Sequence, residues 1–298
     1  MTIDKLELTR KIVDELNDEI GLPTILVYPN KRKKVTLTSS KFGGLPYWDN
    51  SQAYPTDKDG NKLKLLAQFN LDEISECGFD GINTLPKSGI LQFFLLSGND
   101  YLYGSDLDDY TNNNCFRVIY HSSIKNITRE EVLALGIPTA LVSATDYEPI
   151  TGEIGLDFKV ARKANPESMD FKNIFIEKAS SYGWEINGTG NCVSDNLYSC
   201  LYSGLEEDDV VNELDYCTAI EENCLLGYPT YTQLGDPRFE DNSYSKYDTQ
   251  LFQMVSYNEE GTKFMAIWGD MGIAHFFISH DKLLNKDFSD VMYYWDCS

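Results

Sequence analysis

Apolar side chains recur along the chain at two spacings, helical and extended, and the pattern predicts a mixed fold. Residues 2–20 carry apolar positions at helical spacing, and Gly21 and Pro23 end that segment. Further helices are predicted at 72–74, after the capping box Thr128–Glu131, over 206–220 and from 281. The predicted strands span 24–28, 35–39, 63–69, 89–96, 115–121, 250–257, 263–268, 272–279 and 291–295. The strands at 250–257, 263–268 and 272–279 are expected to form an antiparallel meander. Segment 171–179 fits a strand or a helix, and residues 145–170 show no clear periodicity.

One stretch near the C-terminus repeats an earlier one. Residues 272–277, Gly-Ile-Ala-His-Phe-Phe, align with residues 89–94, Gly-Ile-Leu-Gln-Phe-Phe, at an offset of 183 residues. The same offset places the Gly-Leu-Pro of residues 44–46 on the Gly-Tyr-Pro of residues 227–229. This register indicates an internal duplication of about residues 40–97 and 223–280. We therefore expect an α+β fold, with a largely antiparallel sheet in two related halves and a few short helices, in a single compact domain over 1–298.

Charge narrows the range of partners. The chain of 298 residues has 47 acidic and 25 basic side chains, which gives a formal net charge of −22. Such a surface repels phosphate backbones, so we expect no nucleic-acid binding. The same field attracts a cationic partner, although negative charge also serves solubility alone.

The sequence predicts a cytoplasmic protein. Charges interrupt the N-terminal residues from Asp4 onward, and no apolar run is long enough for a membrane span. Seven cysteines, an odd number without a C-x-x-C pair, indicate neither a disulfide framework nor a zinc ribbon. The turn of residues 29–34 holds four basic residues, which fits a solvated hairpin tip better than an anion site.

Catalytic motifs do not emerge from the sequence. Of the three histidines, His275 and His280 lie five apart on an expected strand, so their side chains would point to opposite faces. No hydrolase elbow, dinucleotide fingerprint, Walker loop or kinase motif occurs. We therefore assign no catalytic residue, no metal ligand and no cofactor.

Polar residues near the repeats are the remaining candidates for a site. Gln68 and Gln253 each lie inside an apolar strand, and Gln92 and His275 occupy the same repeat position. Buried amides need hydrogen-bond partners, and support of the neighbouring turns is the favoured role. The alternative is a ligand-binding groove between the two halves. Its candidate residues are Trp48, Tyr228, Tyr231, Trp268, Asp270 and His275.

Several motifs resemble the YwqG-like family of bacterial proteins in the expected order along the chain. They span residues 42–48, 65–71, 85–94, 226–229, 250–253, 268–272, 275–277 and 287–297. The resemblance implies an α+β fold with duplicated halves in a largely cytoplasmic family, and it transfers no catalytic residue. A proline-rich stretch commonly follows the first Gly-Gly-x-Pro bend in that family, whereas this chain has Pro55 alone there.

Three functions are compatible with these features. The leading hypothesis is a non-enzymatic acidic binding module that neutralises a basic protein partner such as a toxin. The alternative is a small-ligand-binding protein or enzyme with a groove near Trp268 and Asp270. The third and weakest is a divalent-metal site formed by Asp106, Asp108 and Asp109. The sequence defines neither the partner nor the oligomeric state.

Overall fold

The computed structural model describes residues 4–78, 85–96, 101–139, 148–186, 197, 201, 208–218, 222–233 and 236–297. The chain divides into two compact units. The helical unit comprises residues 1–24, 161–221 and 226–228, and the sheet unit comprises 25–160, 222–225 and 229–298. The single domain expected over 1–298 concerns both units together and stays a prediction.

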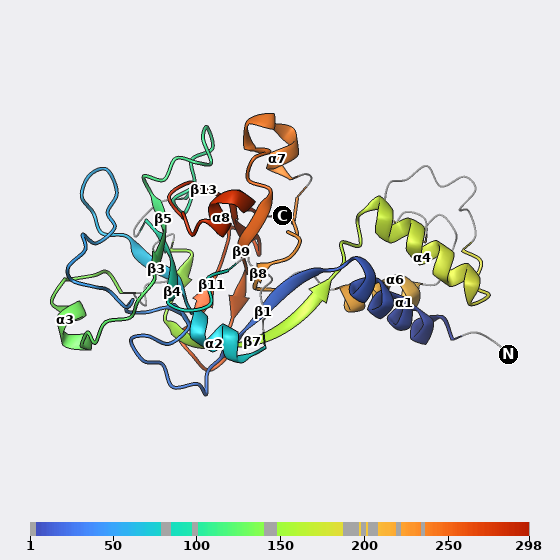
Figure 1. Ribbon diagram of the computed structural model, residues 1–298, viewed down its shortest axis with the longest axis horizontal. Coiled ribbons are helices and arrows are strands. Elements are labelled where there is room, and N and C mark those ends of the chain that lie inside the picture. The colour runs from blue at the N-terminus through green and yellow to red at the C-terminus, as the bar shows by residue number, and fades with distance from the viewer. Residues whose placement is uncertain are drawn as a thin grey trace. The chain divides into compact units, whose positions relative to one another are not determined.

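The described residues of the helical unit form three helices, namely α1 (Lys5–Ile20), α4 (Met169–Ser181) and α6 (Asp208–Thr218). Asp4 caps α1 by accepting the backbone N–H groups of Leu6 and Glu7. α1 lies against α4 and α6, and the three share a core that includes Phe175 and Leu214 (Figure 1). The helices expected over 2–20 and 206–220 are confirmed within the described residues, and segment 171–179 is helical. None of the helices in the described ranges is long and apolar enough to cross a membrane.

The remaining elements belong mainly to the sheet unit. Its strands are β1 (Leu22–Asn30), β2 (Lys41–Gly43), β3 (Lys64–Asn70), β4 (Ile90–Leu95), β5 (Phe116–His121), β6 (Ile150–Thr151), β7 (Glu153–Lys163), β8 (Cys224–Leu226), β9 (Thr249–Val255), β10 (Tyr257–Asn258), β11 (Met265–Ala266), β12 (Ile273–Ile278) and β13 (Val291–Asp296). Its helices are α2 (Leu71–Glu76), α3 (Arg129–Leu133), α7 (Pro237–Glu240), the 3-10 turn η1 (Asn242–Tyr244) and α8 (His280–Leu284). α3 carries the predicted capping box between Thr128 and Glu131.

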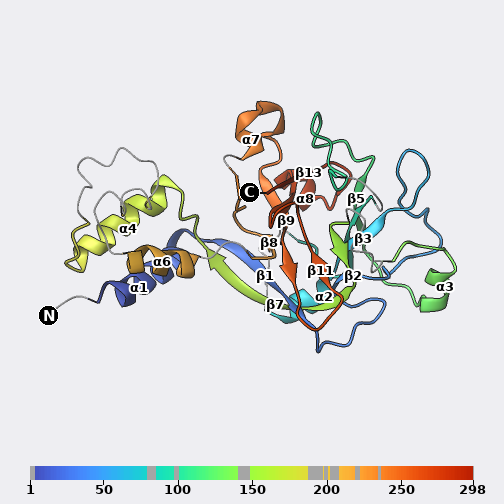
Figure 2. The same ribbon diagram turned by 180° about the vertical axis from the view of Figure 1, so that it is seen from behind.

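Ten strands form one large sheet in the order β13-β12-β9-β8-β1-β7-β2-β3-β4-β5. Figure 2 shows its central strands β8, β1 and β7 from behind. A second, three-stranded sheet has the order β10-β11-β6. We call β2, β3, β4 and β5 the first arm, and β8, β9, β12 and β13 the second arm. The predicted mixed fold with a largely antiparallel sheet is confirmed.

An aromatic core joins the inner faces of the two arms. The ring centroid of Phe252 from β9 lies 5.1 Å from that of Phe69 and 4.9 Å from that of Phe93, on β3 and β4. Phe93 also lies 4.9 Å from Phe276 of β12. All four side chains are fully buried. Because side chains alternate along a strand, the polar neighbours Gln68, Gln92, Gln253 and His275 lie on the opposite, outer faces.

In the first arm, buried glutamines support the bend that follows β2. Gln68 and Gln92 lie directly opposite each other on β3 and β4. The backbone N–H of Tyr47 donates to Gln68 Oε1 at 2.8 Å, and Gln68 Nε2 donates to the Ser39 carbonyl at 2.8 Å. The structural role expected for this glutamine is therefore present.

The second arm makes the same two contacts around Gln253. The backbone N–H of Thr230 donates to Gln253 Oε1 at 2.9 Å, and Gln253 Nε2 donates to the Glu222 carbonyl at 3.0 Å. Thr230 and Glu222 lie 183 residues after Tyr47 and Ser39, which is the offset of the sequence repeat.

Backbone conformation also corresponds at the two bends. Gly43 and Gly44 have φ values of 63° and 74°, and Leu226 and Gly227 have 62° and 81°. These left-handed values favour glycine, so Leu226 adopts a conformation that is uncommon for a side chain of its kind. At Gly44 an added Cβ would also lie within 2.0 Å of the Glu153 carboxylate.

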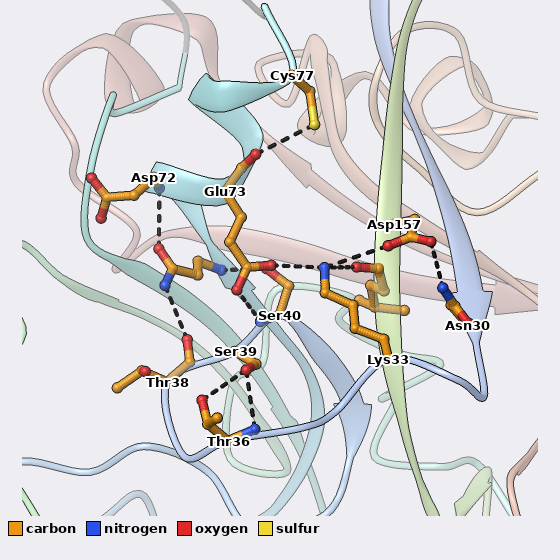
Figure 3. Close-up of polar contacts among 12 residues, drawn as sticks. Asn30, Lys33, Thr36, Thr38, Ser39, Ser40, Asp72, Glu73, Cys77 and Asp157 are labelled. Carbon is orange, nitrogen blue, oxygen red and sulfur yellow. Dashed lines mark hydrogen bonds and ion pairs between the residues drawn. The ribbon is translucent and has the colours of Figure 1, made fainter.

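Polar contacts hold the segment between β1 and β2 (Figure 3). Lys33 Nζ lies 3.1 Å from the carboxylate of Glu73 in α2 and 3.5 Å from that of Asp157 in β7. Glu73 also accepts the backbone N–H of Ser40 at 3.3 Å. Lys31, in the same turn, pairs with Glu259 at 2.7 Å. Two of the four basic residues of this turn thus bind carboxylates of the chain itself.

Two strand predictions are wrong in detail, and one strand was not predicted. Residues 35–39 form no strand, because the Ser39 hydroxyl accepts the Thr36 backbone N–H at 3.0 Å and closes a local turn instead. The strand expected over 263–268 is the two-residue β11, which belongs to the small sheet, so β9 pairs directly with β12 rather than through a meander. β7 was missed, although residues 154–160 alternate between apolar and other side chains.

The aromatic core gives a stability prediction. Phe252→Ala removes a ring that packs against both arms and should lower the free energy of unfolding by about 3–5 kcal/mol. Urea unfolding followed by tryptophan fluorescence measures the loss. Phe239→Ala is the matched control, because Phe239 is 83% exposed and its truncation should change stability by less than about 0.5 kcal/mol. Equal effects of the two substitutions would contradict the central role of the core.

Candidate functional site

The outer face of the second arm holds a buried histidine. His275 is on β12, opposite Gln253 of β9 and Tyr294 of β13, and it is fully buried. Aromatic rings pack around its imidazole, with centroids at 4.8 Å for Tyr231 and 5.6 Å for Phe277. The imidazole is therefore a buried polar group that is packed against aromatic rings.

An aspartate lies beside this histidine with one oxygen free. Asp296, at the end of β13, places Oδ1 3.9 Å from His275 Nε2, which is too long for a hydrogen bond. Among the described residues, neither ring nitrogen of His275 makes a hydrogen bond, and Asp296 Oδ1 accepts none. Buried polar atoms normally find partners. These three unmet atoms, together with the unmet hydroxyls of the adjoining Tyr231 and Thr232, therefore mark a candidate site.

Backbone amides hold the aspartate in position. Asp296 Oδ2 accepts the backbone N–H groups of Thr232 and Gln233, each at 2.8 Å. Burial raises the pKa of the Asp296 carboxyl, and these hydrogen bonds oppose that shift. Burial lowers the pKa of His275 to about 3, so its imidazole is neutral near pH 7.

An ion pair lies beside the His275–Asp296 pair. Asp236 and Arg238 form an ion pair with an N–O distance of 2.5 Å, and both side chains are nearly buried. The Arg238 guanidinium lies 4.1 Å from the ring centroid of Phe277 and donates to the Tyr247 carbonyl at 3.0 Å. The effects of the two charges on the pKa of His275 oppose each other, with Asp236 raising it and Arg238 lowering it.

The corresponding place in the first arm is closed. Gln92 Nε2 donates to the Tyr47 carbonyl at 2.7 Å and to Gln68 Oε1 at 2.8 Å, and Gln92 Oε1 accepts from His121 Nε2 at 2.9 Å. His121 ends β5 opposite Ile90, just as Asp296 ends β13 opposite Ile273. Where the first arm forms a complete Gln92–His121 network, the second arm has the incomplete His275–Asp296 pair.

The comparison with known families covers the same region. Residues 40–297 match the family described as a domain of unknown function (DUF1963). The chain belongs to the DUF1963 family. A search of curated proteins finds no match to the chain. The matched range includes both arms and the whole His275–Asp296 site.

Within this DUF1963 chain, the six residues proposed from the sequence occupy different surroundings. Trp48 is buried against Phe94 and His121 in the first arm, and Trp268 is buried beside Tyr103. Asp270 lies in an exposed turn, and Tyr228 is assigned to the helical unit. Tyr231 and His275 are in direct contact. A groove between the halves stays a prediction, while these two residues belong to the site described here.

Sequence reasoning missed the other members of the site. Asp296 falls outside the matched repeat segments, and Asp236 and Arg238 precede β9 in a polar stretch. The one available signal was an acidic residue directly after the aromatic run of β13, at residues 293–295. His280, expected on the same strand as His275, instead begins helix α8.

The acidic loop proposed as a metal site makes local turn contacts. Asp106 accepts from Asp108 N at 3.0 Å and from Asn112 Nδ2 at 2.6 Å, and Asp109 accepts from Thr111 N at 2.9 Å. Among the residues that the structure describes, no three metal-ligating side chains lie together in one place. The loop geometry is thus explained by turn formation.

Matched substitutions distinguish the two arms. Gln92→Leu leaves Tyr47 O, Gln68 Oε1 and His121 Nε2 without that partner, and it should cost about 2 kcal/mol or more in unfolding free energy. His275→Leu breaks no hydrogen bond among the described residues and should change stability by less than about 1 kcal/mol. Urea denaturation of both variants measures the contrast. A cost at His275 equal to that at Gln92 would identify His275 as a structural residue.

Proposed function

We propose that the protein is a non-enzymatic binding protein that takes a small polar ligand at the His275–Asp296 site. The observation that carries the proposal is the set of unmet polar atoms, namely both nitrogens of His275 and Oδ1 of Asp296, within the described residues. Aromatic walls with a few fixed polar groups are typical of small-ligand sites. The hydrogen-bond network of Gln92 further supports the proposal. At the equivalent position of the first arm, the polar atoms of the side chain find all their partners within the protein.

Binding is favoured over catalysis by the state of the imidazole. A general base works best when its pKa lies near the working pH. The pKa of His275 is lowered to about 3, so its basicity near pH 7 is small. A neutral imidazole still offers one hydrogen-bond donor and one acceptor, which suits recognition.

Three broader inferences accompany this function. We propose that the arms arose by internal duplication, supported by the shared contacts of Gln68 and Gln253 and by the offset of 183 residues between the bends. The ordered motifs support placement among YwqG-like proteins. Free thiols at Cys77, Cys217 and Cys297 support a reducing, cytoplasmic setting.

Nuclear magnetic resonance of the three histidines tests the binding function. Protein labelled with [¹⁵N]histidine is titrated with urea, acetamide, methylammonium, acetate and phosphate at constant ionic strength. At least one compound should shift the His275 signals in a saturable way and leave those of His280 unchanged, because His280 lies on the exposed end of α8. His280→Gln should preserve the response. A panel without effect on His275 would contradict the proposal.

A basic protein partner is the second candidate function. Its support is the formal net charge of −22, together with ten lysines and arginines that already pair with carboxylates among the described residues. Because acidic side chains outnumber basic ones, the negative field of the protein would speed the association of a cationic protein.

Affinity purification with mass spectrometry at two salt concentrations tests the second function. A basic protein should be retained at low salt and released at high salt, because added ions screen charges at the surface. If no protein is retained at low salt, the partner hypothesis fails.

A further inference from the structure

The Asp296 carboxylate is the charged group at the centre of the site. Its side chain is 2% exposed, and the Thr232 and Gln233 amides bind Oδ2. Those hydrogen bonds favour the ionised form, whereas burial opposes it. An ionised carboxylate removed from water is stabilised chiefly by a cation near its remaining oxygen.

The chain's neighbouring cationic groups are unsuited to this role. His275 faces Oδ1 but is neutral, since burial lowers its pKa to about 3. Arg238 is committed to Asp236, to the Tyr247 carbonyl and to the face of Phe277. Across the described ranges, no lysine or arginine forms an ion pair with Asp296.

Aromatic rings surround the His275 imidazole. The ring centroids of Tyr231, Phe277 and Tyr294 lie 4.8, 5.6 and 6.2 Å from that of the His275 imidazole. Tyr231 and Tyr294 also lie within 6.3 Å of each other. The negative faces of such rings attract cations, most strongly when the cation is removed from water.

We propose that the His275–Asp296 site binds a small organic cation, a protonated amine. The inference rests on the binding function above and adds the charge class of the ligand. An ammonium group provides N–H donors for Asp296 Oδ1 and for the acceptor nitrogen of neutral His275, so it satisfies both kinds of unmet acceptor. Its charge compensates the carboxylate, and the formal net charge of −22 draws cations toward the protein.

Other ligand classes meet fewer of these requirements. An anion would lie against the carboxylate of Asp296 and be repelled by it. A neutral amide could satisfy hydrogen bonds but would leave the carboxylate charge without compensation. The protonated amine is therefore the class that matches the charge, the unmet acceptors and the aromatic surroundings together.

Titration with methylammonium chloride tests the inference, with acetamide as the neutral probe and sodium acetate as the anionic probe. The [¹⁵N]histidine signals of His275 provide the readout at constant ionic strength. Methylammonium should bind, and Asp296→Asn should weaken its binding by roughly thirtyfold or more, since the buried charge partner is lost. Asp281→Asn removes the same charge at an exposed position and should change affinity less than about twofold.

The outcomes separate the two proposals. If acetamide or acetate binds and methylammonium does not, the cation inference is overturned while the binding function stands. If neither these three probes nor urea and phosphate perturb His275, both fail. Methylammonium binding that Asp296→Asn leaves unchanged would also overturn the inference.

Acidity provides an independent check on the carboxylate. Methylammonium affinity should fall as the pH is lowered through the pKa of Asp296, which burial raises, because protonation removes the charge of the carboxylate. Among the residues that the structure describes, the other titratable or charged groups near the site are His275, Tyr231, Tyr294 and the Asp236–Arg238 ion pair. In the Asp296→Asn variant, the fall in methylammonium affinity at low pH should disappear. Its persistence in that variant would contradict the inference.

Discussion

The contact of four phenylalanine rings between the arms determines how the rest of the sheet unit is arranged. Phe69 and Phe93 meet Phe252 and Phe276 on the inner faces. Burial of such rings is the largest favourable contribution available to a sheet of this kind. Because the side chains of a strand alternate, this packing also fixes which residues point outward. The polar layer on the outer face of each arm is thus a consequence of the aromatic core.

Buried amides impose the next constraint. A glutamine enclosed on the outer face must satisfy its oxygen and its nitrogen, and the bend beside it supplies a backbone N–H and a carbonyl. Gln68 and Gln253 meet the requirement in the same way, through residues at matching positions of the two bends. Each bend follows two residues with left-handed backbone, so its path is restricted on both sides. Similar bends therefore recur although most of their side chains differ.

The sequence predicted the parts of this arrangement that depend on local pattern. The repeat located Gln92 and His275 at equivalent positions, and apolar spacing located most strands. It did not reveal Asp296 as a site residue, because the pairing of β12 with β13 and the amides of residues 232–233 bring that carboxylate to His275 from separate segments. The alternation of β7 was readable, yet adjacent turn residues obscured it. The missing strand over 35–39 shows the opposite case, in which hydroxyl groups formed a turn within an extended pattern.

The difference between Gln92 and His275 then has a physical interpretation. A glutamine amide can donate two hydrogen bonds and accept others, and Gln92 uses this capacity to close its network. A neutral imidazole has one donor and one acceptor at fixed positions in a ring, so it cannot make the same three contacts. Histidine at position 275 leaves hydrogen-bonding capacity unused where the first arm uses it for stability. We propose that this unused capacity beside a buried carboxylate serves recognition of a ligand rather than folding, since functional sites commonly sacrifice local stability.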